Sequence, residues 1–364
     1  MPKLWPSSAS SLIVLLITLA FTLFVLVTNY WNPMAFVRLG TRYGQGDPNG
    51  TIGYDGQFAY QIALNPREAA PYLDIPAYRY QRILYPLTAR AISLGQPKLI
   101  PWALISLNIL ALTVGTYGMG LILAQQRLSR WYALPVGLFV GQLVSLRLDL
   151  NEPFSLTFAI MGVYTFEMGR SRWGAFFLAL SMLSKETAIA FVAGYLIYFF
   201  LRQKWRLLIE TGLISLGPFA IWQLGLWLRF GQLGLRSGGA GATAFSLIPF
   251  GGLLAFGLDS LERFVSVVMI VGPLVVLPSV AFMIVLLYFF RRSDMIPVAL
   301  VLSLHIVMMA TLPFSTYVDL PGLLRLTSGL VVATILFAAL IRSRKILNYS
   351  LLWIASLAYL RFFI

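Results

Sequence analysis

Apolar runs recur along the whole chain and are separated by short polar stretches. The runs are continuous rather than alternating, which indicates membrane-spanning α-helices and not the strands of an outer-membrane barrel. We therefore predict an all-α, polytopic transmembrane helical bundle of about eleven spans. The predicted spans lie at about 11–30, 99–124, 132–146, 154–168, 173–184, 187–201, 207–228, 265–290, 296–312, 326–341 and 346–361.

Two longer polar stretches interrupt this pattern. Residues 31–98 contain two amphipathic pieces, at about 55–64 and 79–95, that we expect to lie along the membrane surface as interfacial helices. Residues 229–257 are rich in glycine and small residues, which predicts a flexible loop. Neither stretch suggests a separate soluble unit, so we predict a single integral-membrane domain over 1–364.

Composition and charge narrow the class of protein. Hydrophobic residues make up 59% of the chain and charged residues 11%, whereas a soluble domain carries about 25% charged residues. The net charge of +14 comes from short clusters of bases between apolar runs, which indicates membrane topology rather than nucleic-acid binding. The chain has no cysteine and one histidine, which argues against thiolate or histidine metal centres and Ser-His-Asp catalysis.

The bases also predict the orientation of the chain. With the N-terminus in the cytoplasm, the short basic turns at 125–131, 169–172, 202–206, 291–295 and 342–345 all fall on the inner side. All acidic residues except Glu167, Glu210 and Asp294 then lie at outer ends or in outer loops. This gathering of acids indicates either a balance of outward-facing arginines or a polar site that faces the outside.

Four of the predicted spans, between 132 and 201, are unusually short. Each has roughly 12–16 residues, or about 18–24 Å of helix, against a hydrocarbon core of about 30 Å. Their outer ends should therefore stop below the outer interface, where charged side chains must line a protein cavity. We expect a recessed polar cavity roofed by 31–98. The residues at these ends are Arg147, Asp149, Asn151, Glu152, Lys185 and Glu186.

Asp55 is the candidate reactive residue of the first polar loop. Gly56 follows it and permits a tight turn or a close approach to a ligand. A carboxylate here would take a proton from an attacking hydroxyl, or help to hold a divalent cation such as Mg or Mn. The structural alternative, compatible with both, is a helix N-cap. Tyr54 and Gln57 flank Asp55 and are predicted substrate contacts.

Arg79 and Arg82 are the candidate anion-binding residues of the same loop. They lie three residues apart, so they share one face of a helix. Arginine binds phosphate in a bidentate manner, and the tyrosines around this pair are typical of the headgroup level. The alternative is that the pair only anchors the loop at the interface.

Acids and bases at the recessed turns are further predicted substrate contacts. Asp149 and Glu152 lie in one turn, where Asn151 is a candidate N-cap. Lys185 and Glu186 lie in another, where Lys185 is a candidate phosphate ligand. The structural alternative for this second turn is a simple pair between the two adjacent charges.

Two arginines further along complete the set of candidates. Arg236 lies in the glycine-rich loop, which either closes over a lipid phosphate or serves as a plain linker. Arg325 opens a late span and would bind a phosphate or pair with Asp319. His305 lies within an apolar run and is expected to be a core histidine.

The residues of the first loop resemble a known family. Tyr54-Asp-Gly-Gln-Phe-Ala-Tyr-Gln together with Arg79-Tyr-Gln-Arg-Ile-Leu-Tyr-Pro is similar to bacterial GT-C-class membrane glycosyltransferases of cell-surface glycopolymer formation. The specific part of the resemblance covers about 50–90. Asn151-Glu-Pro and Leu183-Ser-Lys-Glu-Thr are weaker matches. The chain departs from members that carry two adjacent acids in the first loop, which puts a metal in doubt.

The resemblance implies transfer of a sugar from a polyprenyl-phosphate donor to a glycan, lipid or protein acceptor at the outer face of a bacterial plasma membrane. Asp55 would be the catalytic base, and basic residues would hold the donor phosphate. Two alternatives stay open at this point. One is a transporter or flippase of lipid-linked sugars, and the other is a non-catalytic subunit of a polysaccharide export complex.

Overall fold

The computed structural model of the chain describes residues 8–362. Every regular element within this range is a helix, and the one β-bridge joins Leu39 to Gly53. Five helices are long and apolar enough to cross a membrane. They are α1 (Ala9–Thr28), α7 (Ile100–Gln125), α13 (Trp205–Phe230), the continuous stretch Leu261–Arg292 and α19 (Leu320–Leu340). The expected all-α class and a lipid environment are thus supported.

The count of about eleven spans is not confirmed, because several apolar segments form helices shorter than a bilayer. The segment predicted at 132–146 is broken at Phe139, whose extended backbone separates α8 from α9. The helices of this region are η2 (Arg130–Ala133), α8 (Leu134–Leu138), α9 (Val140–Arg147), α10 (Glu152–Glu167), α11 (Ser171–Ser184), η3 (Glu186–Ala188) and α12 (Ile189–Leu201).

The C-terminal half is similarly mixed. A π-helical turn, η5 (Gly272–Val276), connects the two halves of the long stretch Leu261–Arg292. The final segment, predicted as one span, begins as an α-helix and continues as a 3₁₀-helix. The remaining elements are η4 (Gly234–Arg236), α14 (Gly251–Asp259), α15 (Leu261–Val271), α16 (Leu277–Arg292), α17 (Pro297–Ala310), α18 (Phe314–Val318), α20 (Arg344–Ser350) and η6 (Leu351–Phe362).

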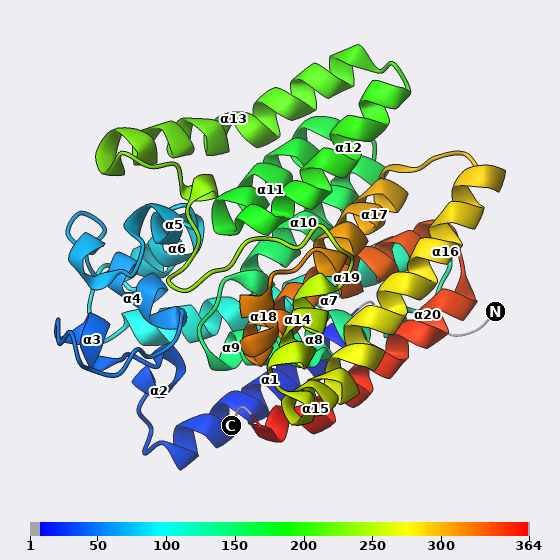
Figure 1. Cartoon of the computed structure of the whole chain (residues 1–364). Coiled ribbons are helices and arrows are strands. Elements are labelled where there is room, and N and C mark those ends of the chain that lie inside the picture. The colour runs from blue at the N-terminus through cyan, green and yellow to red at the C-terminus, as the bar shows by residue number, and fades with distance from the viewer. Residues whose placement is uncertain (1–7, 363–364) are drawn as a thin grey trace.

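The first polar loop forms a group of short helices at one end of the bundle (blue to cyan in Figure 1). The piece predicted at 55–64 is confirmed as a helix, whereas the piece at 79–95 is two helices interrupted after Tyr80. The elements of this loop are α2 (Met34–Val37), α3 (Thr41–Gly44), α4 (Gly56–Leu64), η1 (Ala70–Tyr72), α5 (Pro76–Tyr80) and α6 (Leu84–Ile92).

Hydrogen bonds to backbone carbonyls fix these short helices in place. Arg90 donates to the carbonyls of Ala63 and Leu64, which caps the last turn of α4. The Trp222 indole of α13 donates to the Tyr80 carbonyl at 2.8 Å and ties α5 to a long helix. These side chains donate to carbonyls that have no partner within the short helices. The hydrogen bonds anchor the loop to the helical bundle.

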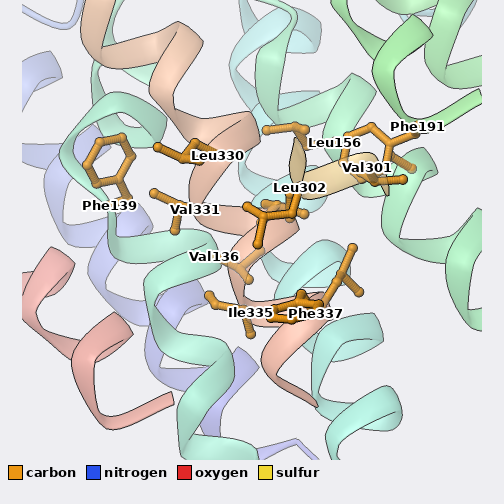
Figure 2. Packing of buried hydrophobic residues seen from close by; sticks show 14 of the residues in the cluster. Val136, Phe139, Leu156, Phe191, Val301, Leu302, Leu330, Val331, Ile335 and Phe337 are labelled. Atoms are coloured by element: carbon orange, nitrogen blue, oxygen red, sulfur yellow. The ribbon is translucent and has the colours of Figure 1, made fainter. Parts of the chain in front are cut away.

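The central helix is α19, which is buried over most of its length. Side chains of α19 interlock with those of α8, α9, α10, α12 and α17 in one large apolar cluster (Figure 2). Small residues allow the closest approaches, as expected for helices that associate within lipid. A Cβ on Gly141 of α9 would lie 2.1 Å from the Leu324 carbonyl oxygen of α19. This contact positions the start of α19, and therefore Arg325.

Replacement of Gly141 should test this close approach. Gly141→Val places side-chain atoms against the α19 backbone, and overpacking of this kind costs about 1–3 kcal/mol. We expect a lower apparent melting temperature in detergent. Gly217→Val is the matched control, because a Cβ at Gly217 meets no atom within 4 Å. Equal melting temperatures for the two variants would contradict the close contact.

Candidate functional site

Asp55 lies where the first loop meets the core of the bundle. It occupies the N-cap position of α4 but makes no side-chain capping bond. Its Oδ1 lies 3.1 Å from Arg79 Nη1, and its Oδ2 accepts a 2.6 Å hydrogen bond from Arg325 Nη2. The carboxylate is therefore held by two guanidinium groups, one from the loop and one from α19.

The glycine after Asp55 makes this position reachable. A Cβ on Gly56 would lie 2.1 Å from the Leu148 carbonyl oxygen, in the turn between α9 and α10. Only a residue without a side chain lets the loop backbone approach that turn so closely. The sequence Asp55-Gly56 thus brings the carboxylate down onto the recessed turn that also carries Asp149.

Asp74 holds Arg79 from the other side. Both Nε and Nη2 of Arg79 donate to the Asp74 carboxylate at 2.7 Å, in a bidentate pair. The guanidinium also lies over the Phe58 ring, 4.1 Å from its centroid. Sequence reasoning did not single out Asp74, although an acid five residues before Arg79 at the start of a short helix was a usable signal.

Arg82 contacts a different acid. Its Nε and Nη2 donate to Glu186 at 2.8 and 2.5 Å, and Nη2 also donates to the Tyr78 hydroxyl. The two arginines of α5 and the following turn therefore point at separate partners. Tyr78 is one of the tyrosines expected to accompany this arginine pair, and its hydroxyl contacts Arg82 directly.

Lys185 and Arg325 share Glu152. Lys185 donates to Glu152 Oε1, and Arg325 Nε lies 3.4 Å from the same oxygen. The predicted alternative of a pair between Lys185 and its neighbour Glu186 is wrong, because the extended backbone at Lys185 turns the two side chains to different partners. The ion pair between Lys185 and Glu152 joins the N-terminus of α10 to the turn after α11.

Asp319 does not pair with Arg325 in the way considered from the sequence. Its carboxylate accepts from the Tyr54 hydroxyl, 3.0 Å from each oxygen. Arg325 is free to bridge Asp55 and Glu152 as a result. We call the set so formed the charge network. Its members are Asp55, Asp74, Arg79, Arg82, Glu152, Lys185, Glu186 and Arg325.

The charge network is buried and internally balanced. The side chains of Arg79, Glu152 and Lys185 are 8%, 2% and 4% exposed, whereas that of Asp55 is 22% exposed. Desolvation of charges at this depth is costly, so such groups persist only where they are paired or functional. The network therefore marks this region as the candidate site.

The electrostatics of Asp55 follow from its two partners. Burial alone would raise the pKa of its carboxyl, but the guanidinium groups of Arg79 and Arg325 outweigh burial and hold that pKa well below its usual range. The resting carboxylate is thus ionised and a weak base.

Asp149 is a buried acid next to this network. Both of its oxygens are buried without a hydrogen-bond partner among the described residues, and its backbone has a left-handed φ of 48°. Burial raises the pKa of its carboxyl well above the usual value, against a smaller opposite effect of Arg147. Burial and the missing hydrogen-bond partners thus both disfavour the charged form of this carboxyl.

Two small cavities flank Asp55 and Arg325. One, of about 30 Å³, is lined by Asp55, Arg79, Arg82 and Asp149 among others. The other, of about 20 Å³, lies among Glu152, Lys185, His305 and Arg325. Each is large enough for only one or two water molecules. A sugar therefore requires the surrounding loops to open.

A glycine-rich segment crosses the site from the first loop to α18, in front of the bundle in Figure 1. The Ala240 amide donates to Asp74 at 3.1 Å, and Thr243 exchanges hydrogen bonds with Ser315 in the first turn of α18. Part of the stretch predicted as a loop over 229–257 is helical, in η4 and α14. This segment therefore contacts the charge network through Asp74 and the start of α18 through Ser315.

Other predicted contacts lie outside the network. Gln57 is buried and binds backbone, accepting from the Gly40 amide and donating to the Ile52 carbonyl. Arg236 is exposed on η4 and forms no ion pair within residues 8–362. Asn151 does not cap α10. Its amide donates to the Ser184 carbonyl at 2.6 Å and ties α10 to the end of α11.

His305 is buried in α17, as expected for a core histidine, with its Nδ1 2.9 Å from the Val301 carbonyl oxygen.

The residues around Asp55 do not fit a divalent cation, because Arg79 and Arg325 occupy both of its oxygens. No group of three or more His, Cys, Asp or Glu side chains within residues 8–362 is placed to hold a metal ion.

Comparisons with known proteins leave the site to be interpreted from its own geometry. No protein-family model matches the chain, and neither the curated proteins nor the solved structures include a significant match.

Removal of Glu152 should destabilise the protein strongly. Glu152→Gln leaves Lys185 and Arg325 buried without their shared carboxylate, which costs about 3–5 kcal/mol for a buried pair. Thermal unfolding in detergent measures this loss. Asp294→Asn is the control, because Asp294 pairs with Arg202 at the surface with 94% of its side chain exposed. Similar melting curves for the two variants would contradict a tightly coupled network.

Proposed function

We propose that this protein is a membrane glycosyltransferase that moves a sugar from a polyprenyl-phosphate donor to an acceptor hydroxyl at the extracytoplasmic face of a bacterial plasma membrane. One observation carries the proposal: Asp55, from the first polar loop, pairs with Arg79 of the same loop and with Arg325 of α19, while Arg82 and Lys185 lie in the buried ion pairs of the same charge network. A candidate base and candidate phosphate ligands thus share one site.

Arg79 and Arg325 are the proposed phosphate ligands. Each places one guanidinium nitrogen on an oxygen of Asp55, and a phosphate offers oxygens that such nitrogens bind in the same way. A donor phosphate would compete with Asp55 for these groups. As the sugar–phosphate bond breaks, charge accumulates on the phosphate, and fixed cations then stabilise the transition state more than the bound donor.

Asp55 is the proposed base. Once the donor phosphate holds the arginines, the pKa of Asp55 moves back toward its ordinary value and the carboxylate becomes able to accept a proton. The acceptor hydroxyl gives its proton to Asp55, and its oxygen bonds to the anomeric carbon. The bond from that carbon to the phosphate oxygen breaks, and the phosphate leaves with the electron pair. Asp149 lines the same small cavity as Asp55 and is the proposed hydrogen-bond partner of a sugar hydroxyl.

The convergence of acids supports an enzyme over a non-catalytic subunit of an export complex. A scaffold gives no reason for Asp55 and Glu152 to meet at Arg325, or for Asp149 to line the same cavity as Asp55. A flippase for lipid-linked sugars also needs anion-binding groups. Asp55, as a group placed to take a proton, favours a transferase over a flippase. The transfer assay below distinguishes these two functions.

Loss of the base should abolish transfer. We expect purified Asp55→Asn to transfer sugar from polyprenyl-phosphate donors at least about a hundredfold more slowly than wild type. Incorporation of radiolabelled sugar into an acceptor panel measures the rate. Asp294→Asn should keep the wild-type rate, because Asp294 lies on the surface in a pair with Arg202. Wild-type protein that only moves fluorescent lipid-linked sugar across vesicles, without transfer, would establish the flippase instead.

The pH dependence of transfer should show how far the arginines around Asp55 lower the pKa of its carboxyl. Because their charges lower the pKa of the free carboxyl, wild-type kcat/KM should stay level as the pH falls from 7 to about 5. The active ionised form is lost only when the pH falls through that lowered pKa. Arg325→Gln removes one cation, so its acid limb should move to higher pH. An unchanged acid limb in Arg325→Gln would contradict Asp55 as the titrating base.

A further inference from the structure

A second cluster of bases lies at the opposite end of the molecule from the charge network. Helices α11 and α13 both have their C-terminal ends at the network side, since Lys185 follows α11 and Trp222 of α13 contacts α5. Their N-termini, Ser171 and Trp205, are therefore displaced from that side by the helix lengths, about 20 Å for α11.

A cleft of about 700 Å³ opens between these two N-termini. Arg170 precedes α11, Arg172 lies in the first turn of α11, and Arg206 lies in the first turn of α13. Glu210 is the one acid in the lining, and it pairs with Arg172. Arg170 and Arg206 form no ion pair with any described residue, so the cleft has two basic groups available for an anion.

The backbone adds to this positive potential. Each helix presents unpaired amide groups and the positive end of its dipole at its N-terminus. Here two such ends lie beside the same three arginines. The tendency of basic residues to gather in cytoplasmic loops explains the presence of bases in each turn. It does not explain why bases from two turns line one cleft.

Exposed apolar side chains continue from the cleft along both helices. Trp173 and Phe176 of α11 are exposed, and so are Trp205 and Ile209 of α13. Tryptophan is typical of the membrane interface, where the ring faces both headgroups and acyl chains. A soluble anion would use only the arginines, whereas a phospholipid would also cover the apolar surface beneath them.

We propose that this cleft binds the phosphodiester headgroup of an anionic phospholipid in the leaflet opposite the charge network. Arg170 and Arg206 contact the phosphate, and Arg172 orders the rim through Glu210. The acyl chains lie along the exposed apolar faces of α11 and α13. The site is separate from the proposed transfer chemistry, and its test does not depend on that function.

Native mass spectrometry of the purified full chain tests the proposal. Phosphatidylglycerol is titrated against phosphatidylcholine in the same detergent, and retained lipid adducts are counted. We expect wild type to retain phosphatidylglycerol selectively. The triple variant Arg170→Gln/Arg172→Gln/Arg206→Gln should weaken this binding about a hundredfold.

A matched triple variant separates the cleft from overall charge. Arg342→Gln/Arg344→Gln/Lys345→Gln removes the same charge from another basic turn and should bind phosphatidylglycerol as wild type does. Equal loss in both triple variants, or no loss in the first, would overturn the proposal. If the first triple variant does not fold, Arg206→Gln replaces it. Arg206 has no ion-pair partner among residues 8–362, so its removal leaves no acid unpaired.

Inorganic phosphate distinguishes a lipid from a soluble anion. Millimolar phosphate should not displace phosphatidylglycerol, since the acyl chains contribute to binding. Displacement by phosphate alone would show that the cleft takes a small anion, and the lipid assignment would be wrong.

Discussion

The contact on which the rest of the site depends is the carboxylate of Asp55 between Arg79 and Arg325. It joins the first polar loop to the central helix α19 across 270 residues of sequence. Neither arginine is held by Asp55 alone, because Asp74 holds one and Glu152 lies against the other. Removal of Asp55, Arg79 or Arg325 would therefore leave buried charges with fewer partners than they have now, which couples the first polar loop to α19.

The backbone makes this arrangement possible at two glycines. Gly141 lets α9 lie against the carbonyl of Leu324, and this contact fixes the backbone position of the adjacent Arg325. Gly56 lets the loop approach the Leu148 carbonyl, and this contact fixes the backbone position of the adjacent Asp55. The two charged partners meet because both backbones approach closely, while the long arginine side chain spans the remaining gap. Packing and chemistry are coupled through these contacts.

The two ends of the molecule differ in how their charges are used. At the network end, acids and bases neutralise one another in a buried setting, and an incoming anion has to displace a carboxylate. At the other end, the cleft between α11 and α13 keeps exposed arginines with a single acid. The first arrangement suits a ligand that binds transiently and reacts. The second suits a ligand that stays bound, which is consistent with a resident lipid.

The apolar runs alone determined that this chain is helical and built for a lipid environment, because a continuous apolar segment can satisfy its backbone only as a helix. The short runs also located Glu152 and Lys185, since charges beside short helices are costly unless they are used. Asp55 and Arg79 were predicted from the first polar loop, and Arg325 from the start of a late apolar run. Which charges pair was decided only by the tertiary structure. Adjacent Lys185 and Glu186 face different partners, Asp319 binds Tyr54 rather than Arg325, and Arg236 remains outside. The span count was not confirmed either, because apolar composition does not say where a helix breaks, as at Phe139. Such pairings depend on which helix ends meet in space, and a linear sequence carries no direct record of that distance.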